Sequence, residues 1–209
     1  MPNAMVIDLS HHNDTVDFSR VRAAGVTGVI HKATQGTGFV DKMYAPRKQP
    51  ALNANLLWGA YHFGTGDDVD KQVDHFLKTT NPDKSFVLVL DFEKNEPEPD
   101  NSMSLDQAKA FLTAVEKRTG QRPRIYTGGS YMKQEVGAAA DPDLAKYRVW
   151  WAQYADAPKL HATWSKFWLW QYSDGDSGPA QHSVPGVGNC DCNTFDGDAD
   201  ALRQNWLTP

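Results

Sequence analysis

Short runs of β-branched and aromatic residues alternate with amphipathic segments along residues 6–127. Residues 86–93 are apolar at most positions before an acidic end, which is typical of a strand buried on both faces of a parallel sheet. Residues 68–80 carry apolar side chains at the spacing of one helix face. The pattern predicts strands at residues 6–10, 29–33, 57–63, 86–93 and 124–127, and helices at 17–24, 44–55, 68–80 and 104–120.

Helices become sparse after residue 127, where strands are expected at 147–154, 167–172 and 191–195, followed by a helix at about 198–206. Strands that alternate with helices indicate βαβ units and a parallel sheet. The fold class is therefore expected to be α/β: a single irregular (β/α) barrel, TIM-like, with eight strands and about five helices. Residues 1–209 are expected to form one catalytic domain, and a doubly wound open sheet is the alternative architecture.

Composition and charge exclude several classes of protein. The net charge of -5 argues against a nucleic-acid-binding protein, which would normally show a basic stripe. No apolar run approaches 18 residues, so no membrane insertion is expected, and a monomer is expected. Residues 1–5 lack the basic start of a signal peptide. A protein that acts outside the cytoplasm would then be released by lysis or by a dedicated export route.

The two cysteines, Cys190 and Cys192, stand at a spacing that fits neither a zinc knuckle nor a CxxC redox motif. We expect two free thiols. A metal held by His11, His12 and Asp8 is conceivable, but loop histidines this close together are more often solvated, so no metal or cofactor is expected.

Acidic residues fall at the ends of predicted strands: Asp8, the pair Asp91 and Glu93, and Asp191. In barrels, catalytic groups come from the carboxyl ends of several strands, because those ends meet at one mouth. Asp91 and Glu93 are two residues apart and should point to the same face. Like charges in a partly dry site raise one pKa, and the carboxyl that keeps its proton can protonate a leaving glycosidic oxygen. Glu93 is the better acid and Asp91 the better anionic partner, although an isolated Asp-x-Glu is usually a helix cap or a solvated loop.

These acids are interleaved with aromatic residues in a set of short motifs that occur in order along nearly the whole chain. The motifs are VIDLS (6–10), HKATQG (31–36), GAYHF (59–63), LDFE (90–93), IYT (125–127), WAQY (151–154), WQY (170–172) and DCNTF (191–195). The ordered set resembles the family 25 glycoside hydrolases, the lysozymes that cleave between N-acetylmuramic acid and N-acetylglucosamine in peptidoglycan glycan strands.

The resemblance implies an irregular eight-stranded barrel in which Glu93 is the catalytic acid/base and Asp91 assists it. It implies that Asp8 and Asp191 complete an acidic pocket, and that Tyr61, Tyr126, Trp151 and Tyr154 orient or line the bound sugar. It also implies a retaining mechanism in which the 2-acetamido oxygen of the substrate is the nucleophile. Asp91 or Asp8 as a direct nucleophile remains an alternative, as do a hydrolase of another N-acetylated glycan such as chitin and a catalytically silent wall-binding barrel.

The chain also departs from the family pattern. Gln35 stands where an acid is common, and His31 occupies a position that is normally apolar. Residues 16–18 lack the usual Asp-Trp pair, and the two cysteines around Asp191 are unusual. The four acids are intact, but substrate fit and the role of Gln35 are open.

Overall fold

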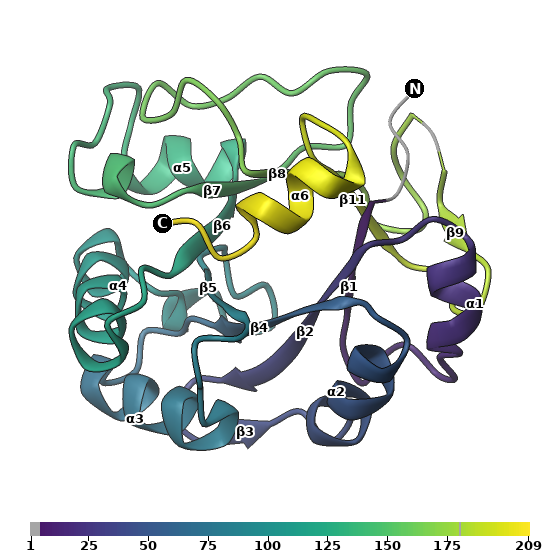
Figure 1. Ribbon diagram of the computed structural model, residues 1–209. Coiled ribbons are helices and arrows are strands. Elements are labelled where there is room, and N and C mark those ends of the chain that lie inside the picture. Colours follow the sequence, from purple (N-terminus) through teal and green to yellow (C-terminus); the bar gives the residue numbers. More distant parts are fainter. Residues whose placement is uncertain (1–4, 180) are drawn as a thin grey trace.

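Eight strands close into a barrel in the computed structural model, which describes residues 5–179 and 181–209 (Figure 1). The barrel strands are β1 (Val6–Leu9), β2 (Gly28–Gln35), β4 (Leu57–Phe63), β5 (Val87–Asp91), β6 (Arg124–Gly128), β7 (Val149–Ala152), β8 (Leu169–Ser173) and β11 (Asp191–Thr194). Outside the barrel, β3 (Phe39–Val40) pairs antiparallel with the end of β2, and β9 (Ser183–Val184) pairs with β10 (Gly188–Asn189).

Helices surround the barrel (Figure 1). They are α1 (Phe18–Ala23), α2 (Tyr44–Asn53), α3 (Val69–Thr80), α4 (Leu105–Thr119), α5 (Gly129–Glu135) and α6 (Ala199–Asn205), with short 3-10 turns at Pro99–Asn101 and Leu144–Lys146. The best-specified helix is α4. The Ser104 side chain and the Gln107 side chain bond reciprocally to each other's backbone N–H, and Gly120 ends the helix at a φ of 64°.

Strand direction decides where the functional residues lie. The barrel strands from β1 through β8 are parallel to their neighbours, whereas β11 runs antiparallel to both β8 and β1 and closes the ring. The parallel strands therefore finish at one end of the barrel, which we call the mouth. Because β11 runs the other way, its first residue, Asp191, lies at that same end.

Side chains on successive strand positions alternate between two apolar cores. Val87 and Val89 of β5 pack inside the barrel, while Leu88 and Leu90 pack between the strands and the helices. Both faces of β5 are buried, which explains why residues 86–93 read as a continuous apolar run.

The end of the barrel opposite the mouth is covered by α6, which lies across the near end in Figure 1. Trp206, at the end of α6, is 1% exposed, and its Nε1–H donates to the backbone oxygen of Trp58 at 2.9 Å. Its ring lies 5.1 Å from that of Trp168. The barrel interior on this side is thus filled by aromatic side chains from both the barrel and α6.

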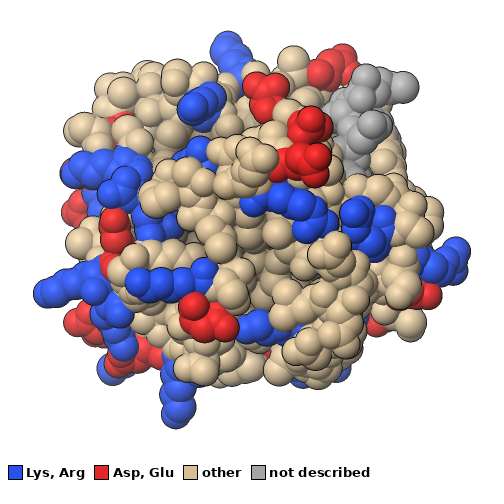
Figure 2. Space-filling model, viewed as in Figure 1, with Lys and Arg blue, Asp and Glu red and all other residues tan. Residues whose placement is uncertain are grey.

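On the face shown in Figure 2, basic and acidic side chains are interspersed, with lysines and arginines most numerous along the side where α3 and α4 lie. Within the described residues, none of the helices has the length and apolar character needed to cross a membrane.

The predicted (β/α) barrel is confirmed, and the open-sheet alternative is wrong because β1 pairs with both β2 and β11. Cys190 and Cys192 are free, as expected, and both are buried. The sequence pattern did not predict α5, β3 or the β9–β10 hairpin. Helix α5 begins at Gly129 with no side-chain cap and is only seven residues long. Strands β3, β9 and β10 have two residues each, which is too short to show a hydrophobic period.

Replacing Trp206 with alanine should lower the free energy of unfolding by about 3–5 kcal/mol, because the large ring leaves a cavity inside the barrel. Leu207, the next residue, is 44% exposed, and its alanine variant should stay within about 0.5 kcal/mol of the parent. Urea unfolding of both variants measures the difference, and equal losses would show that α6 does not seal the barrel.

Candidate active site

Three strands bring acidic side chains to the mouth. Asp8 on β1 lies directly opposite Asp191 on β11 in the antiparallel register. Asp91 is the last residue of β5 and is in register with Phe63 on one side and Tyr126 on the other. Glu93 follows two residues later. The four predicted acids thus meet at one end of the barrel; we call them the carboxyl cluster.

Asp8 is held by two side-chain amides. Its Oδ2 accepts from Gln171 Nε2 at 3.0 Å and from Asn193 Nδ2 at 2.9 Å. Gln171 Oε1 in turn accepts from the hydroxyls of Tyr126, at 2.9 Å, and Tyr154, at 3.0 Å. Asp8 is therefore fixed in place and is linked to two of the predicted aromatic residues.

Gln171 and Asn193 were not predicted as site residues. The sequence contained a signal for Asn193, because alternate residues of a strand point to the same face and Asn193 lies two positions after Asp191 on β11. Trp150 was also not predicted as a site residue. Its Nε1–H donates to Asn193 Oδ1 at 2.6 Å, and its ring contacts those of Tyr126 and Tyr61.

Burial dominates the acid–base properties of Asp8 and Asp191. Burial raises the pKa of Asp8 to about 7, although the hydrogen bonds from Asn193 and Gln171 oppose the shift. Burial and then the charge of Asp8 raise the pKa of Asp191 to about 9. Two carboxyls placed opposite each other in a partly dry site cannot both ionise easily.

Asp91 and Glu93 form a second coupled pair. Burial, followed by the neighbouring Glu93 carboxyl, raises the pKa of Asp91 well above its ordinary value. Burial raises the pKa of Glu93 to about 7; Lys32 opposes this and Asp191 adds to it. The pair therefore retains a proton near neutral pH. Among the described residues, no donor lies within hydrogen-bond distance of the buried Asp91 Oδ1.

The charge of one lysine acts on this pair. Lys32 lies on β2, two positions after the interior residue Ile30. Its Nζ donates to Gln35 Oε1 at 2.7 Å and lies 5.0 Å from the ring centroid of Phe63. Burial lowers the pKa of Lys32, and the charge of Asp91 is the largest influence that opposes the shift. Lys32 was not predicted as a site residue.

The structure brings three of the four predicted aromatic residues to the cluster. Burial raises the pKa values of Tyr61, Tyr126 and Tyr154, and nearby acids of the cluster add to each shift. Tyr154 is 42% exposed and lies at the edge of the site.

Trp151 does not join them. It is 1% exposed and packs in the outer core, 6.4 Å from the ring of Trp164, while Trp150 faces the barrel interior. All four residues of β7 are apolar, so the sequence pattern could not show which tryptophan points inward. The predicted sugar contact from Trp151 is therefore replaced by a packing position.

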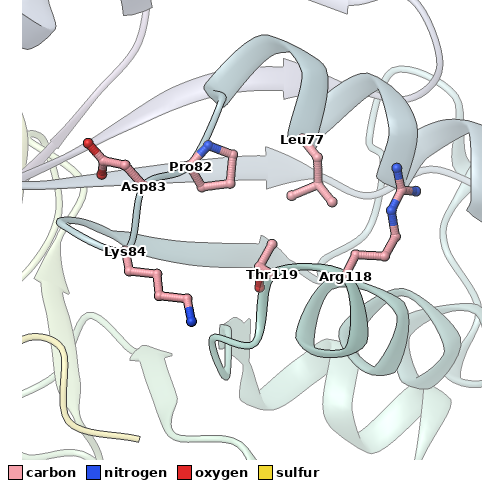
Figure 3. A pocket seen from close by; sticks show the side chains of 6 residues that line it. All are labelled: Leu77, Pro82, Asp83, Lys84, Arg118 and Thr119. Atoms are coloured by element: carbon pink, nitrogen blue, oxygen red, sulfur yellow. The ribbon is translucent and has the colours of Figure 1, made fainter.

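Two surface hollows lie away from the cluster. One, of about 430 Å³, is lined by Leu77, Pro82, Asp83, Lys84, Arg118 and Thr119 (Figure 3). These residues precede β5 or end α3 and α4, so the hollow lies at the opposite end of β5 from Asp91. A larger hollow of about 700 Å³ includes Arg148 and Trp168, which directly precede β7 and β8. Neither hollow includes a residue of the carboxyl cluster.

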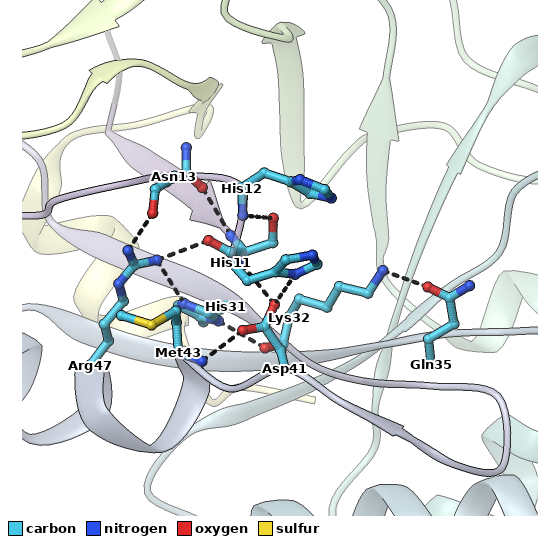
Figure 4. A network of polar contacts seen from close by, with 10 residues as sticks. His11, His12, Asn13, His31, Lys32, Gln35, Asp41, Met43 and Arg47 are labelled. Atoms are coloured by element: carbon cyan, nitrogen blue, oxygen red, sulfur yellow. Dashed lines mark hydrogen bonds and ion pairs between the residues drawn. The ribbon is translucent and has the colours of Figure 1, made fainter.

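The loop after β1 is hydrogen-bonded to Asp41, between β2 and α2, and to Arg47 of α2 (Figure 4). Both the backbone N–H and the ring Nδ1 of His11 bond to Asp41, at 2.8 and 2.9 Å, so His11 is paired with Asp41 and not with Asp8. Arg47 donates to the backbone oxygens of Ser10, Asn13 and Asp14.

His31 supports the same network. Burial lowers its pKa to about 4, so the imidazole is neutral at pH 7. A neutral ring can donate from Nδ1 to the Lys32 backbone oxygen, 2.8 Å away, and accept at Nε2 from Arg47 at 3.3 Å. This contact explains how a histidine fits a buried position that is normally apolar.

The carboxyl cluster can therefore give and take protons near neutral pH. Asp8 and Asp91 are each 6% exposed, while Glu93, Asp191 and Tyr61 are partly exposed, so the cluster opens to solvent on one side. Carboxyls with raised pKa values beside ionisable partners are the arrangement that acid–base catalysis of glycoside cleavage requires.

Comparison with known proteins agrees with this geometry. The family model of glycosyl hydrolases family 25 matches residues 7–180. Lysozyme M1 from Streptomyces globisporus is 29% identical over 94% of this chain and 69% of its own length. The structure of the bacterial lysozyme from Streptomyces coelicolor matches with a TM-score of 0.82 and 28% identity, over 96% of this chain and 95% of that one. The muramidase from Acremonium alcalophilum matches with a TM-score of 0.82 and 27% identity, over 97% and 98%. The chain belongs to family 25 of the glycosyl hydrolases.

Proposed function

We propose that this glycoside hydrolase is a lysozyme, a muramidase that hydrolyses the β-1,4 bond between N-acetylmuramic acid and N-acetylglucosamine in peptidoglycan. The observation that carries the proposal is the placement of Asp91 and Glu93 together at the mouth, where burial raises the pKa of both carboxyls. The similarity to lysozyme M1 and to the muramidase from Acremonium alcalophilum supports this choice of substrate. The described residues act as one catalytic domain and as a monomer.

Glu93 is the general acid. Its pKa of about 7 leaves a substantial protonated fraction at neutral pH, and it is more exposed than Asp91. In the proposed reaction, Glu93 protonates the glycosidic oxygen as the bond to C1 breaks. The ionised Glu93 then removes a proton from the water that completes hydrolysis.

The unpartnered Asp91 Oδ1 supports a substrate-assisted route. A buried carboxylate oxygen without a donor is costly, and the N–H of a 2-acetamido group is a donor of suitable chemistry. Asp91 would accept a hydrogen bond from this N–H and would thereby orient the acetamido oxygen to attack C1 as the leaving group departs. Water then opens the cyclic intermediate from the same face as the original bond, so the configuration is retained.

Asp8 is less suited to direct attack, because two amides already bond to its Oδ2. We assign it, with Asp191, to the wall of the sugar site. Tyr61, Tyr126 and Tyr154 complete that wall.

Glu93→Gln should lower kcat/KM on purified peptidoglycan by about 10²–10⁴-fold, the usual contribution of general acid catalysis. Glu96→Gln is the matched control, since the Glu96 side chain is 75% exposed three residues further on, and it should retain parental activity. New reducing ends measure the rate, and mass spectrometry identifies the fragments. Fragments with muramic acid at the reducing end are expected. Cleavage of soluble chitin oligosaccharides instead would indicate that the substrate is another N-acetylated glycan. Binding to cell walls without cleavage would indicate a catalytically silent wall-binding barrel.

Glu93→Gln should also stabilise the protein at pH 8 by about 1–2 kcal/mol, allowing for the partial exposure of Glu93. The pKa of Glu93 rises from 4.5 to about 7 on folding. Between these two pH values, the folded state keeps a proton on Glu93 that the unfolded state has lost. This carboxyl therefore makes the protein less stable as pH rises through that window. Thermal unfolding at pH 8 and pH 4 checks the sign: the gain should vanish at pH 4, and an equal gain at both pH values would contradict it.

A further inference from the structure

The positive charge of Lys32 acts on two members of the carboxyl cluster, Asp91 and Glu93. Its ammonium lies between the rings of Phe39 and Phe63, 5.5 and 5.0 Å from their centroids. Phe63 is in register with Asp91 on the neighbouring strand. Lys32 is thus held by two aromatic faces, one from β3 and one from β4, and Asp91 and Glu93 both act on its charge.

The hydrogen-bond partner of this ammonium is neutral. Gln35 Oε1 accepts from Lys32 Nζ at 2.7 Å (Figure 4), and a glutamate at this position would form an ion pair at the same distance. The glutamine therefore positions the ammonium without cancelling its charge.

The other ionisable groups around Lys32 are two uncharged side chains on β4 and one acid after β3. On β4, Tyr61 is an uncharged hydroxyl with a raised pKa, and burial lowers the pKa of His62 to about 3, so its ring is neutral. After β3, the Asp41 carboxylate also acts on the charge of Lys32, with a larger effect than that of Glu93. It already accepts from the backbone N–H groups of His11 and Met43 and from the His11 ring.

We propose that Lys32 is a positioning residue that acts as the counter-charge of the carboxyl cluster, and that Gln35 keeps this charge available to Asp91 and Glu93. The proposal rests on the proposed function for its catalytic meaning. A fixed cation favours the ionised form of any nearby carboxyl. Lys32 therefore sets the pH range in which the pair holds one proton and one negative charge.

Removal of the cation should move both titrations of the pair to higher pH. Activity requires the Asp91–Glu93 pair to carry a single proton. The profile of kcat/KM against pH is therefore bell-shaped, and its two limbs report the two titrations of the pair. Lys32→Met should shift both limbs upward by at least about 1 pH unit, the low end of the effect of a nearby opposite charge.

Four further variants separate charge from packing. Lys32→Arg keeps the charge and should restore the parental profile. Gln35→Glu should shift the limbs upward as Lys32→Met does, because the new carboxylate pairs with Lys32. Gln35→Met removes the hydrogen bond but not the charge and should shift them less. Lys42→Met, at an exposed lysine just beyond the β2–β3 hairpin, is the control and should leave the profile unchanged.

The carboxyl titrations are read directly by NMR of protein labelled with ¹³C at the Asp and Glu side-chain carboxyl carbons, with Glu93→Gln used to identify the Glu93 signal. This measurement needs no substrate, so it tests Lys32 even if the protein proves inactive on peptidoglycan. Upward shifts in Lys32→Met and Gln35→Glu, but not in Lys32→Arg or Lys42→Met, are the expected result. Shifts below about 0.3 unit in both charge-changing variants would overturn the proposal.

Discussion

Removal of carboxyl groups from water is the constraint on which the rest of this site depends. A carboxylate in a dry environment lacks the solvent that stabilises its charge, so its pKa rises unless donors or cations replace the water. Asp8 receives two amide donors, and Asp91 and Glu93 have Lys32 nearby, yet burial still raises the pKa values of all three. The site is thus destabilised at neutral pH in order to hold a proton, a cost that functional sites commonly impose on the fold.

The barrel makes this arrangement possible through its single antiparallel strand. If β11 were parallel to its neighbours, Asp191 would lie at the far end, beside α6. Reversal of this strand brings Asp191 opposite Asp8 at the mouth. The opposite end is then free to be sealed by Trp206 and α6, which separates the structural end of the barrel from the reactive end.

Much of this organisation could be predicted from the sequence. The continuous apolar run before Asp91 indicated a doubly buried strand, and the two-residue spacing of Asp91 and Glu93 indicated a carboxyl pair. Residues without a periodic signal were not predictable in the same way. Strand β7 is apolar on both faces, so Trp150 and Trp151 could be told apart only by the register of the closed barrel. Lys32 gains its role from the neutrality of Gln35 and from aromatic side chains on two other strands, which are tertiary contacts that a local pattern does not contain.

The infrared spectrum of the protein at pH 7 tests the central claim most directly, because the carbonyl stretch of a protonated carboxyl group is separate from the bands of ionised carboxylates. We predict such a band at pH 7, weaker in Glu93→Gln and losing intensity in the parent as pH rises through about 9, the pKa of Asp191. A spectrum at pH 7 without any protonated carboxyl would contradict the account, because the cluster would then hold no proton to give to a glycosidic oxygen.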